Sequence, residues 1–396
     1  MTDSDAIAEK TDERSVSERP VAPIPFIDLA AQRARLGDRI EAAIGRVLDH
    51  GKFILGPEVA QLEAELGAFC GAKHVISCAN GTDALVLAMM ALEIGPGDAV
   101  LVPSFTFSAS AESVVLAGAT PVFVDVLEDT FNIDPAGLMA GLEAARAAGL
   151  KPRAVMTVDL FGQPADYDPI VGFCGENGLL LIADAAQSFG GSYAGTRVGT
   201  LATVTTTSFF PSKPFACYGD GGAIFTDDEQ LDSLLRSIRV HGQGVNKYDN
   251  LRIGMNSRLD TLQAAILLEK LGIFTAELEM RRVVAGRYEA GFAGTVDRVI
   301  PSRVIDASVS AWALYTVRIR GGGRDAVQAA LSDLGIPSGV YYPKSLHQQP
   351  AYAECPRASD LETSERLCGD VLSLPMHPYL DEEAQGIVVD ALRRAL

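Results

Sequence analysis

The sequence lacks any apolar run of about 18 residues, the length that a helix needs to cross a bilayer. Its first residues also lack the short apolar core of a secretory signal. The six cysteines form no Cys-x-x-Cys pair and no Cys/His spacing typical of a metal site. We therefore expect a cytoplasmic protein with free thiols, no bound metal and no membrane segment.

Basic residues are scarce as well. The chain has 33 lysines and arginines against 51 acids, a net charge of -18, and no cluster of positive charge. Nonspecific binding to nucleic acid or anionic lipid depends on neutralising phosphate, so neither partner is expected. In contrast, 48% of the residues are hydrophobic, which is enough for a large core, and a length of 396 residues favours two domains.

Short apolar runs and helical patterns alternate along most of the chain. Residues 1–22 are polar, and we predict that they form a disordered acidic tail. Seven Val/Ile/Leu-rich runs follow between residues 75 and 226, as in strands buried between two layers of helices. We expect an α/β protein whose large, doubly wound, mostly parallel sheet domain covers residues 23–275, including N-terminal helices. A smaller C-terminal α/β domain, with a strand at Ser338–Tyr342, should cover residues 276–396.

Lys213 is the candidate for covalent chemistry. It lies between Pro211 and Pro214, which fix the backbone, and several glycines follow it within the same loop. Neighbouring phenylalanines can desolvate its ammonium, which lowers the pKa of an amine and frees the lone pair that attacks a carbonyl carbon. The alternative is an ordinary lysine exposed on a Pro/Gly loop.

A candidate anion site follows the first predicted strand. The segment Asn80-Gly81-Thr82-Asp83 opens a helix, whose free amides and positive dipole end can bind a phosphate. An ordinary helix cap would explain the same residues. Ser208, five residues before Lys213, can add its hydroxyl to such a site.

Two further segments suit a flat, positively charged ring. Asp184 closes an apolar run, with Gln187 three residues later, and its carboxylate needs a cation or hydrogen bonds. Phe107 comes just after another predicted strand and can stack on a heterocycle. Capping a turn and filling the core are the alternatives for Asp184 and Phe107. Together with a lysine amine and an anion site, the set matches pyridoxal 5'-phosphate (PLP).

Several longer stretches occur in a characteristic order: Ile27-Asp28-Leu29, Gly56-Pro57-Glu58, Asn80 to Leu85, Asp184-Ala-Ala-Gln-Ser188, the Lys213 loop, and Gly254 to Ala265. On these stretches the chain resembles the DegT/DnrJ/EryC1/StrS family of sugar aminotransferases. The resemblance extends from about residue 24 to the C-terminus. It implies the fold type I aminotransferase architecture.

The resemblance also implies roles for the site residues. Lys213 would form the Schiff base with PLP, Asp184 would pair with the ring nitrogen, and Gln187 would contact the ring hydroxyl. Phe107 would occupy the stacking position. The phosphate would be held by Gly81, Thr82 and Ser208, and by Asn256 from the neighbouring subunit. The active form should therefore be a homodimer with shared active sites.

The reaction implied is transamination, in which L-glutamate usually gives the amine and a keto sugar nucleotide takes it up. The stretches beginning at Ser208, Tyr218 and Leu374 look closest to members that aminate C3 of UDP-2-acetamido-2-deoxy-3-oxo-glucuronate for bacterial O-antigen. The expected substrate contacts are Arg258, Tyr341, Tyr342 and His347, of which Arg258 suits the uronate carboxylate. Tyr341 departs from the resemblance, because a histidine is expected at its position.

Three alternatives stay open at this point. A dTDP-linked 3-keto-6-deoxyhexose would keep the fold and change the sugar, since Arg258 also occurs in members that handle uncharged deoxy sugars. A PLP-dependent sugar dehydratase of the same family would carry a histidine in place of Lys213. A regulator without enzymatic activity would need a DNA-binding appendage or a basic face, and this acidic chain offers neither.

Overall fold

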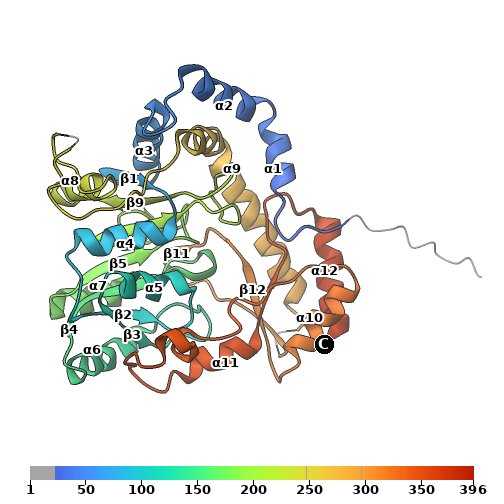
Figure 1. Ribbon diagram of the computed structural model, residues 1–396. Coiled ribbons are helices and arrows are strands. Elements are labelled where there is room, and N and C mark those ends of the chain that lie inside the picture. The colour runs from blue at the N-terminus through green and yellow to red at the C-terminus, as the bar shows by residue number, and fades with distance from the viewer. Residues whose placement is uncertain (1–22, 247, 296) are drawn as a thin grey trace, which may run out of the picture.

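The computed structural model describes residues 23–246, 248–295 and 297–396 (Figure 1). The predicted tail, residues 1–22, lies outside the described residues. A larger unit surrounds a seven-stranded sheet, a smaller unit surrounds a three-stranded sheet, and the long helix α9 (Thr261–Phe292) joins them. This arrangement confirms the predicted fold class.

The central sheet is built from the seven apolar runs that the sequence predicts as strands. Its strand order is β1-β9-β8-β5-β4-β2-β3. Every neighbouring pair from β8 to β3 is parallel, whereas β9 runs antiparallel to both β1 and β8. The strands are β1 (His74–Cys78), β2 (Asp98–Pro103), β3 (Thr120–Val124), β4 (Lys151–Val158), β5 (Leu180–Asp184), β8 (Val204–Ser208) and β9 (Gly222–Thr226).

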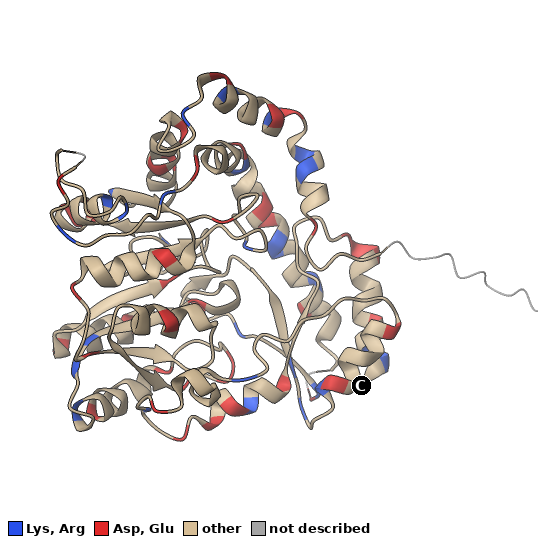
Figure 2. Cartoon of the chain, in the orientation of Figure 1, with Lys and Arg blue, Asp and Glu red and all other residues tan. Residues whose placement is uncertain are grey.

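Alternate strand residues face two different layers of helices. In β2, Val100 and Val102 pack in the core formed with α4, α5 and α8, whereas Leu101 packs in the core formed with α6 and α7. Burial on both faces explains why the strands read as unbroken apolar runs. Figure 2 shows the charged residues mainly on the surrounding helices and loops. The helices are α4 (Gly81–Ala91), α5 (Ser108–Leu116), α6 (Leu138–Ala147), α7 (Tyr167–Asn177) and α8 (Glu229–Ile238).

Three N-terminal helices form an arch beside the sheet, and α9 runs from them toward the smaller unit (Figure 1). They are α1 (Leu29–Leu36), α2 (Arg39–His50) and α3 (Pro57–Cys70). The first half of α9 contributes Phe274 to a core with Phe189 and Phe209. Its second half contributes Tyr288 and Phe292 to the core of the smaller unit. The predicted boundary between residues 275 and 276 therefore falls inside a continuous helix.

The smaller unit packs helices on an antiparallel sheet of order β10-β12-β13. The strand expected at Ser338–Tyr342 does not form: within this described segment, Gly339 alone bridges to Ser373. The last two residues of the segment, Tyr341 and Tyr342, line the cavity described below. The elements are β10 (Val299–Pro301), β12 (Tyr315–Ile319), α10 (Arg324–Asp333), α11 (Glu362–Asp370), β13 (Val371–Leu374) and α12 (Glu382–Ala395); a separate small sheet joins β6 (Ser192–Tyr193), β7 (Thr196–Arg197) and β11 (Ser308–Val309).

Among the described residues, no helix combines the length and the apolar character that crossing a membrane requires. All six cysteines are free, as the sequence predicts. The described part of the chain gathers no group of three His, Cys, Asp or Glu residues suited to a metal ion. The notable cluster of polar groups lies instead where the strands of the central sheet end.

Candidate active site

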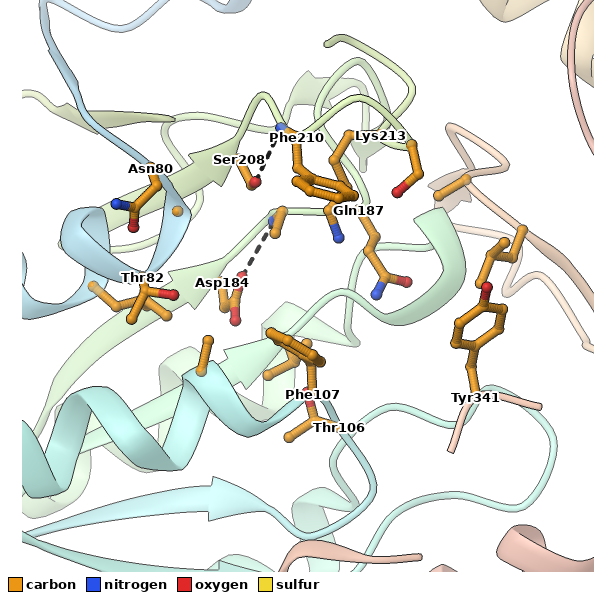
Figure 3. A pocket seen from close by; sticks show the side chains of 18 of the residues that line it. Asn80, Thr82, Thr106, Phe107, Asp184, Gln187, Ser208, Phe210, Lys213 and Tyr341 are labelled. Atoms are coloured by element: carbon orange, nitrogen blue, oxygen red, sulfur yellow. Dashed lines mark hydrogen bonds between the residues drawn. The ribbon is translucent and has the colours of Figure 1, made fainter. Parts of the chain in front are cut away.

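A cavity of about 660 Å³ lies beyond the carboxyl ends of β4, β5 and β8 (Figure 3). Its wall also includes the N-terminal segment at Phe26 and Ile27, and residues of the smaller unit. Open α/β sheets bind ligands at this position. The predicted site residues in the wall are Gly81, Thr82, Phe107, Asp184, Gln187, Ser208, Lys213, Tyr341 and Tyr342.

The start of α4 and the end of β8 form an anion cradle. Asn80 caps the helix through Oδ1, which accepts a hydrogen bond from the Asp83 amide at 2.8 Å. Gly81 approaches Ser208 so closely that a Cβ on the glycine would lie 2.7 Å from the serine Cβ. The helix N-terminus and the hydroxyls of Thr82 and Ser208 therefore border one part of the cavity, where a phosphate fits. The motif is a helix cap, and its free amides and the neighbouring hydroxyls have the geometry that suits an anion.

Asp184 is the last residue of β5 and is 6% exposed. Its Oδ2 accepts a hydrogen bond from Ser110 Oγ at 2.9 Å, and its Oδ1 accepts one from the Ala186 amide at 3.2 Å. Burial raises the pKa of Asp184 above its ordinary value, although both hydrogen bonds and the charge of Lys213 oppose this shift. A pyridinium in the cavity would give the buried carboxylate a cationic partner, so the site suits such a ring.

Lys213 lines the cavity on the side of Ser208 and Phe210, across from Phe107 (Figure 3). Its backbone amide donates to the Phe210 carbonyl at 2.8 Å, which closes a turn. Burial lowers the pKa of the Lys213 amine, against the opposing charge of Asp184. A lowered pKa leaves more of the amine unprotonated at neutral pH, as a nucleophile or a proton carrier requires.

Phe107 presents a ring that is 55% exposed. Its centroid lies 6.2 Å from that of Tyr342, whose hydroxyl accepts a hydrogen bond from Gln187 Nε2 at 3.4 Å. Gln187 Oε1 in turn accepts from the Phe161 amide at 2.7 Å. An exposed ring on a cavity wall can stack on a flat heterocycle, while the two partners of Gln187 fix its amide beside that space.

Tyr341 forms the outer part of the wall with Phe26, at a distance of 6.3 Å between ring centroids. The Phe26 carbonyl accepts a hydrogen bond from the Met376 amide at 3.1 Å. The N-terminal segment is therefore tied to the smaller unit and belongs to the site. Sequence reasoning quoted the neighbouring Ile27-Asp28-Leu29 but gave it no role.

Asn256 and Arg258 do not belong to this cavity wall. Asn256 is exposed, and the Nε of Arg258 is buried without a hydrogen-bond partner among the described residues. Both residues lie just before α9, where they alternate with the buried Ser257 and Leu259. The role of Asn256 at the site of a neighbouring subunit and the role of Arg258 as a substrate contact stay predictions.

His347 is buried and does not line the cavity, so its expected contact with the sugar stays a prediction that this structure does not support. Its Nδ1 lies 2.7 Å from Ser104 Oγ, and its Nε2 lies 3.0 Å from Glu365 Oε1. The first contact fastens the segment after Tyr342 to the end of β2, and the second fastens it to α11. Ser104 is fully buried, so this Ser-His-Glu arrangement is a structural fastening rather than a hydrolytic site.

Sequence reasoning missed Ser110, which contacts Asp184, and Thr106, whose Oγ1 lies 3.3 Å from Ser110 Oγ. Ser110 lies in the first turn of α5, which follows β2, whereas Asp184 ends β5. The two meet because β4 alone separates β2 from β5 in the sheet. The sequence signal was a small polar residue soon after a strand end, which is too common to single out.

Comparisons with known proteins agree with this geometry. Residues 34–393 match the DegT/DnrJ/EryC1/StrS aminotransferase family. The UDP-2-acetamido-2-deoxy-3-oxo-D-glucuronate aminotransferase of Pseudomonas aeruginosa is 49% identical over 370 residues, which cover 93% of this chain and 99% of the relative.

Two solved structures share the fold. The crystal structure of a DegT DnrJ EryC1 StrS aminotransferase from Brucella abortus is 49% identical, with a TM-score of 0.91, and the match covers 94% of this chain and 99% of that chain. NtdA from Bacillus subtilis, solved with bound cofactor PMP, is 28% identical, with a TM-score of 0.83, and the match covers 96% of this chain and 86% of that chain.

Proposed function

Because this chain belongs to the DegT/DnrJ/EryC1/StrS aminotransferase family, we propose that it transfers an amino group from L-glutamate to C3 of a UDP-linked 3-keto sugar. It is a PLP-dependent nucleotide-sugar aminotransferase. The observation that carries the proposal is the convergence of Lys213, Asp184 and the Gly81–Ser208 anion cradle on one cavity.

The residues present fit PLP at each of its polar groups. The helix start at Gly81 and Thr82, with Ser208, would hold the phosphate, and Asp184 would face the ring nitrogen. Phe107 would cover one face of the ring, and Gln187 would lie beside its hydroxyl. When bound, the cofactor supplies an aldehyde for the amino group and a ring that withdraws electrons from the reacting carbon.

The protein supplies the proton transfers. Lys213 Nζ is the amine in the cavity wall, and burial keeps a fraction of it unprotonated at neutral pH. In our proposal Nζ removes the proton from the α-carbon of the amino donor. In the half-reaction with the keto sugar, Nζ delivers a proton to the sugar carbon that receives the amine. Asp184, fixed by Ser110 and Ala186, would stabilise a positive charge on the ring nitrogen of the bound cofactor. The aromatic wall of Phe26, Phe107 and Tyr341 limits the access of water.

The proposed sugar is UDP-2-acetamido-2-deoxy-3-oxo-glucuronate, and the product would serve the synthesis of O-antigen or another surface polysaccharide. The support is the name of the Pseudomonas aeruginosa relative, since the match covers 99% of that protein. Tyr341 and Tyr342 are the proposed substrate contacts within one subunit. The uronate carboxylate would be bound by Arg258 of a second copy, since Arg258 is outside the wall of its own cavity.

We further propose that the enzyme is a homodimer. The segment that leads to Asn256 carries exposed apolar side chains, namely Val245, Tyr248, Leu251 and Ile253. Exposed apolar patches of this kind mark interaction surfaces. A second copy packed there would bring Asn256 and Arg258 to the neighbouring site. Six free thiols suit a reducing compartment, so we place the reaction in the cytoplasm.

Two separate half-reactions test the proposal. The PLP-loaded protein is first mixed with L-glutamate, and the spectrum should change to that of pyridoxamine phosphate. After removal of glutamate, the UDP-linked 3-keto uronate and a dTDP-linked 3-keto-6-deoxyhexose are offered separately. Recovery of the PLP spectrum with the uronate supports the proposed sugar, whereas recovery with the deoxyhexose alone contradicts it. The variant Arg258→Ala should impair the uronate reaction far more than a reaction with an uncharged sugar.

A further inference from the structure

Lys270 is a buried cation that the reaction described above does not use. It lies on α9, is 1% exposed, and donates from Nζ to the Ala216 carbonyl at 2.7 Å. Nζ also lies 4.2 Å from the centroid of the Tyr218 ring. Burying an ammonium costs free energy unless its surroundings compensate for the lost water. Here a carbonyl oxygen and an aromatic face provide that compensation, and both belong to the loop that carries Lys213.

Gln263 contacts the same loop from the same face of α9. It precedes Lys270 by seven residues, or about two helical turns. Its Oε1 accepts a hydrogen bond from the Tyr218 amide at 2.9 Å, and its Nε2 donates to the Tyr218 carbonyl at 3.2 Å. Two side chains of one rigid helix therefore hold the backbone of Ala216 and Tyr218.

Cys217, which lies between Ala216 and Tyr218, is held from the side of the central sheet. The Cys217 amide donates to the carbonyl of Phe209, the residue directly after β8, at 2.8 Å. Pro211 and Pro214, which flank the Lys213 turn, have no amide hydrogen to donate. The path of the chain on either side of Lys213 thus depends on β8 at one end and on the α9 contacts at the other.

We propose that Lys270 is a positioning residue for transamination, which fixes the Ala216–Tyr218 segment and thereby the direction in which the Lys213 amine enters the cavity. This inference rests on the proposed role of Lys213. Burial lowers the pKa of Lys270 to about 8, and the negative charge of Glu277 opposes this shift. Small displacements of a reacting group slow a reaction strongly, by about 100-fold for 1 Å.

The test compares Lys270→Met with Lys151→Met, a matched change at an exposed lysine on β4. Methionine keeps the length and the apolar stem of Lys270 and removes the donor and the charge. For each variant we would measure kcat, the KM for the keto sugar, and the pH midpoint of the absorption band of bound PLP. That midpoint reports the surroundings of Lys213, so a role limited to stability would not move it.

We expect Lys270→Met to lower kcat by about 10- to 100-fold and to shift the pH midpoint, with a smaller change in KM. Lys151→Met should match the wild type. If Lys270→Met does not fold, Gln263→Leu removes the other contact and should shift the midpoint in the same direction. A folded Lys270→Met with wild-type kcat and midpoint would overturn the inference, as would an unaltered Gln263→Leu when Lys270→Met fails to fold.

The variant Lys213→Ala separates this result from the proposed function. If Lys213→Ala retains full turnover, the role of Lys213 fails, and the inference on Lys270 fails with it. If Lys213→Ala is inactive while folded Lys270→Met behaves as wild type, only the inference on Lys270 fails.

Discussion

Ser110 Oγ donates a hydrogen bond to Asp184 Oδ2 over 2.9 Å, and both side chains are buried. The bond stabilises the charged form of the carboxylate, which burial alone would disfavour. A charged Asp184 is what a protonated ring nitrogen requires. In the proposed site, Ser110 would therefore help Asp184 to stay charged beside the ring nitrogen of the cofactor.

Removing this bond should weaken cofactor binding. In Ser110→Ala the pKa of Asp184 rises further, and the carboxylate pairs less well with the ring nitrogen. A hydrogen bond to a charged group is worth about 1.5–3 kcal/mol, so PLP should bind about tenfold or more weakly. Equilibrium dialysis measures this. Ser113→Ala is the matched control, because Ser113 is buried in the same helix and its hydroxyl donates to the Ser110 carbonyl and does not contact Asp184 in the described structure.

The anion cradle should not tolerate a side chain at Gly81. A Cβ there would lie 2.7 Å from Ser208 Cβ, so Gly81→Ala must push the helix start away from β8. We expect a loss of PLP affinity of about tenfold or more, since the phosphate would lose its aligned amides. Gly172→Ala is the control, because that glycine is also helical and a Cβ there has nothing within 4 Å. Equal affinities for the two variants would contradict the assignment of the cradle.

Glu63 should contribute to stability in a pH-dependent way. Its Oε1 pairs with Arg239 at 2.6 Å and its Oε2 with Arg236 at 2.7 Å, which ties α3 to α8. Burial raises the pKa of Glu63, but the two arginines and the Ser77 amide outweigh this effect, and the folded pKa is lowered. The contribution is therefore fully present above the unfolded pKa and disappears as the pH falls through the lower folded pKa.

The variant Glu63→Gln leaves Arg239 buried without its charged partner. Breaking a buried ion pair costs about 3–5 kcal/mol in the free energy of unfolding, and the partial exposure of Arg236 favours the lower end. Urea unfolding at pH 7 and below pH 4 measures the difference from the wild type. A difference that stays constant over this range would show that the carboxylate charge is not the cause.

Substitutions at His347 and Tyr341 should have opposite effects on stability and on the KM for the keto sugar. His347 lies outside the cavity wall, whereas Tyr341 is part of it. His347→Phe removes the imidazole partner of Ser104 Oγ and should lower the free energy of unfolding by about 1–3 kcal/mol. The KM for the keto sugar should stay close to that of the wild type. Tyr341→Ala should raise this KM with little effect on stability. A large rise in KM for His347→Phe would restore the sequence-based role.

The sequence predicted the parts of the fold that depend on local apolar pattern. All strands of the central sheet were recognised, since strands covered on both faces must be apolar throughout. The segment Ser338–Tyr342 has the same β-branched and aromatic character, yet its tyrosines face a cavity and form no ladder. The pattern of residues in the sequence cannot distinguish a strand from an extended segment that lines a cavity, because both favour β-branched and aromatic residues.

The candidate site was predictable where a motif lies at a strand end or a few residues after it, as at Asp184, Gly81 and Lys213. Ser110, Phe26 and Lys270 were not, because their roles arise from contacts across the sheet or across the two units. His347 is the opposite case, a predicted site residue that does not line the cavity. A histidine near predicted substrate contacts suggested a ligand, but its ring is enclosed by Ser104 and Glu365.

The identity of the cofactor-bearing lysine is the central claim, and one measurement tests it directly. The PLP-loaded protein is reduced with sodium borohydride, digested and mapped by mass spectrometry, beside Lys213→Ala treated in the same way. We predict about one cofactor per subunit on the peptide that contains Lys213, and none on the variant. A cofactor attached to another lysine, or equal labelling of Lys213→Ala, would contradict the account.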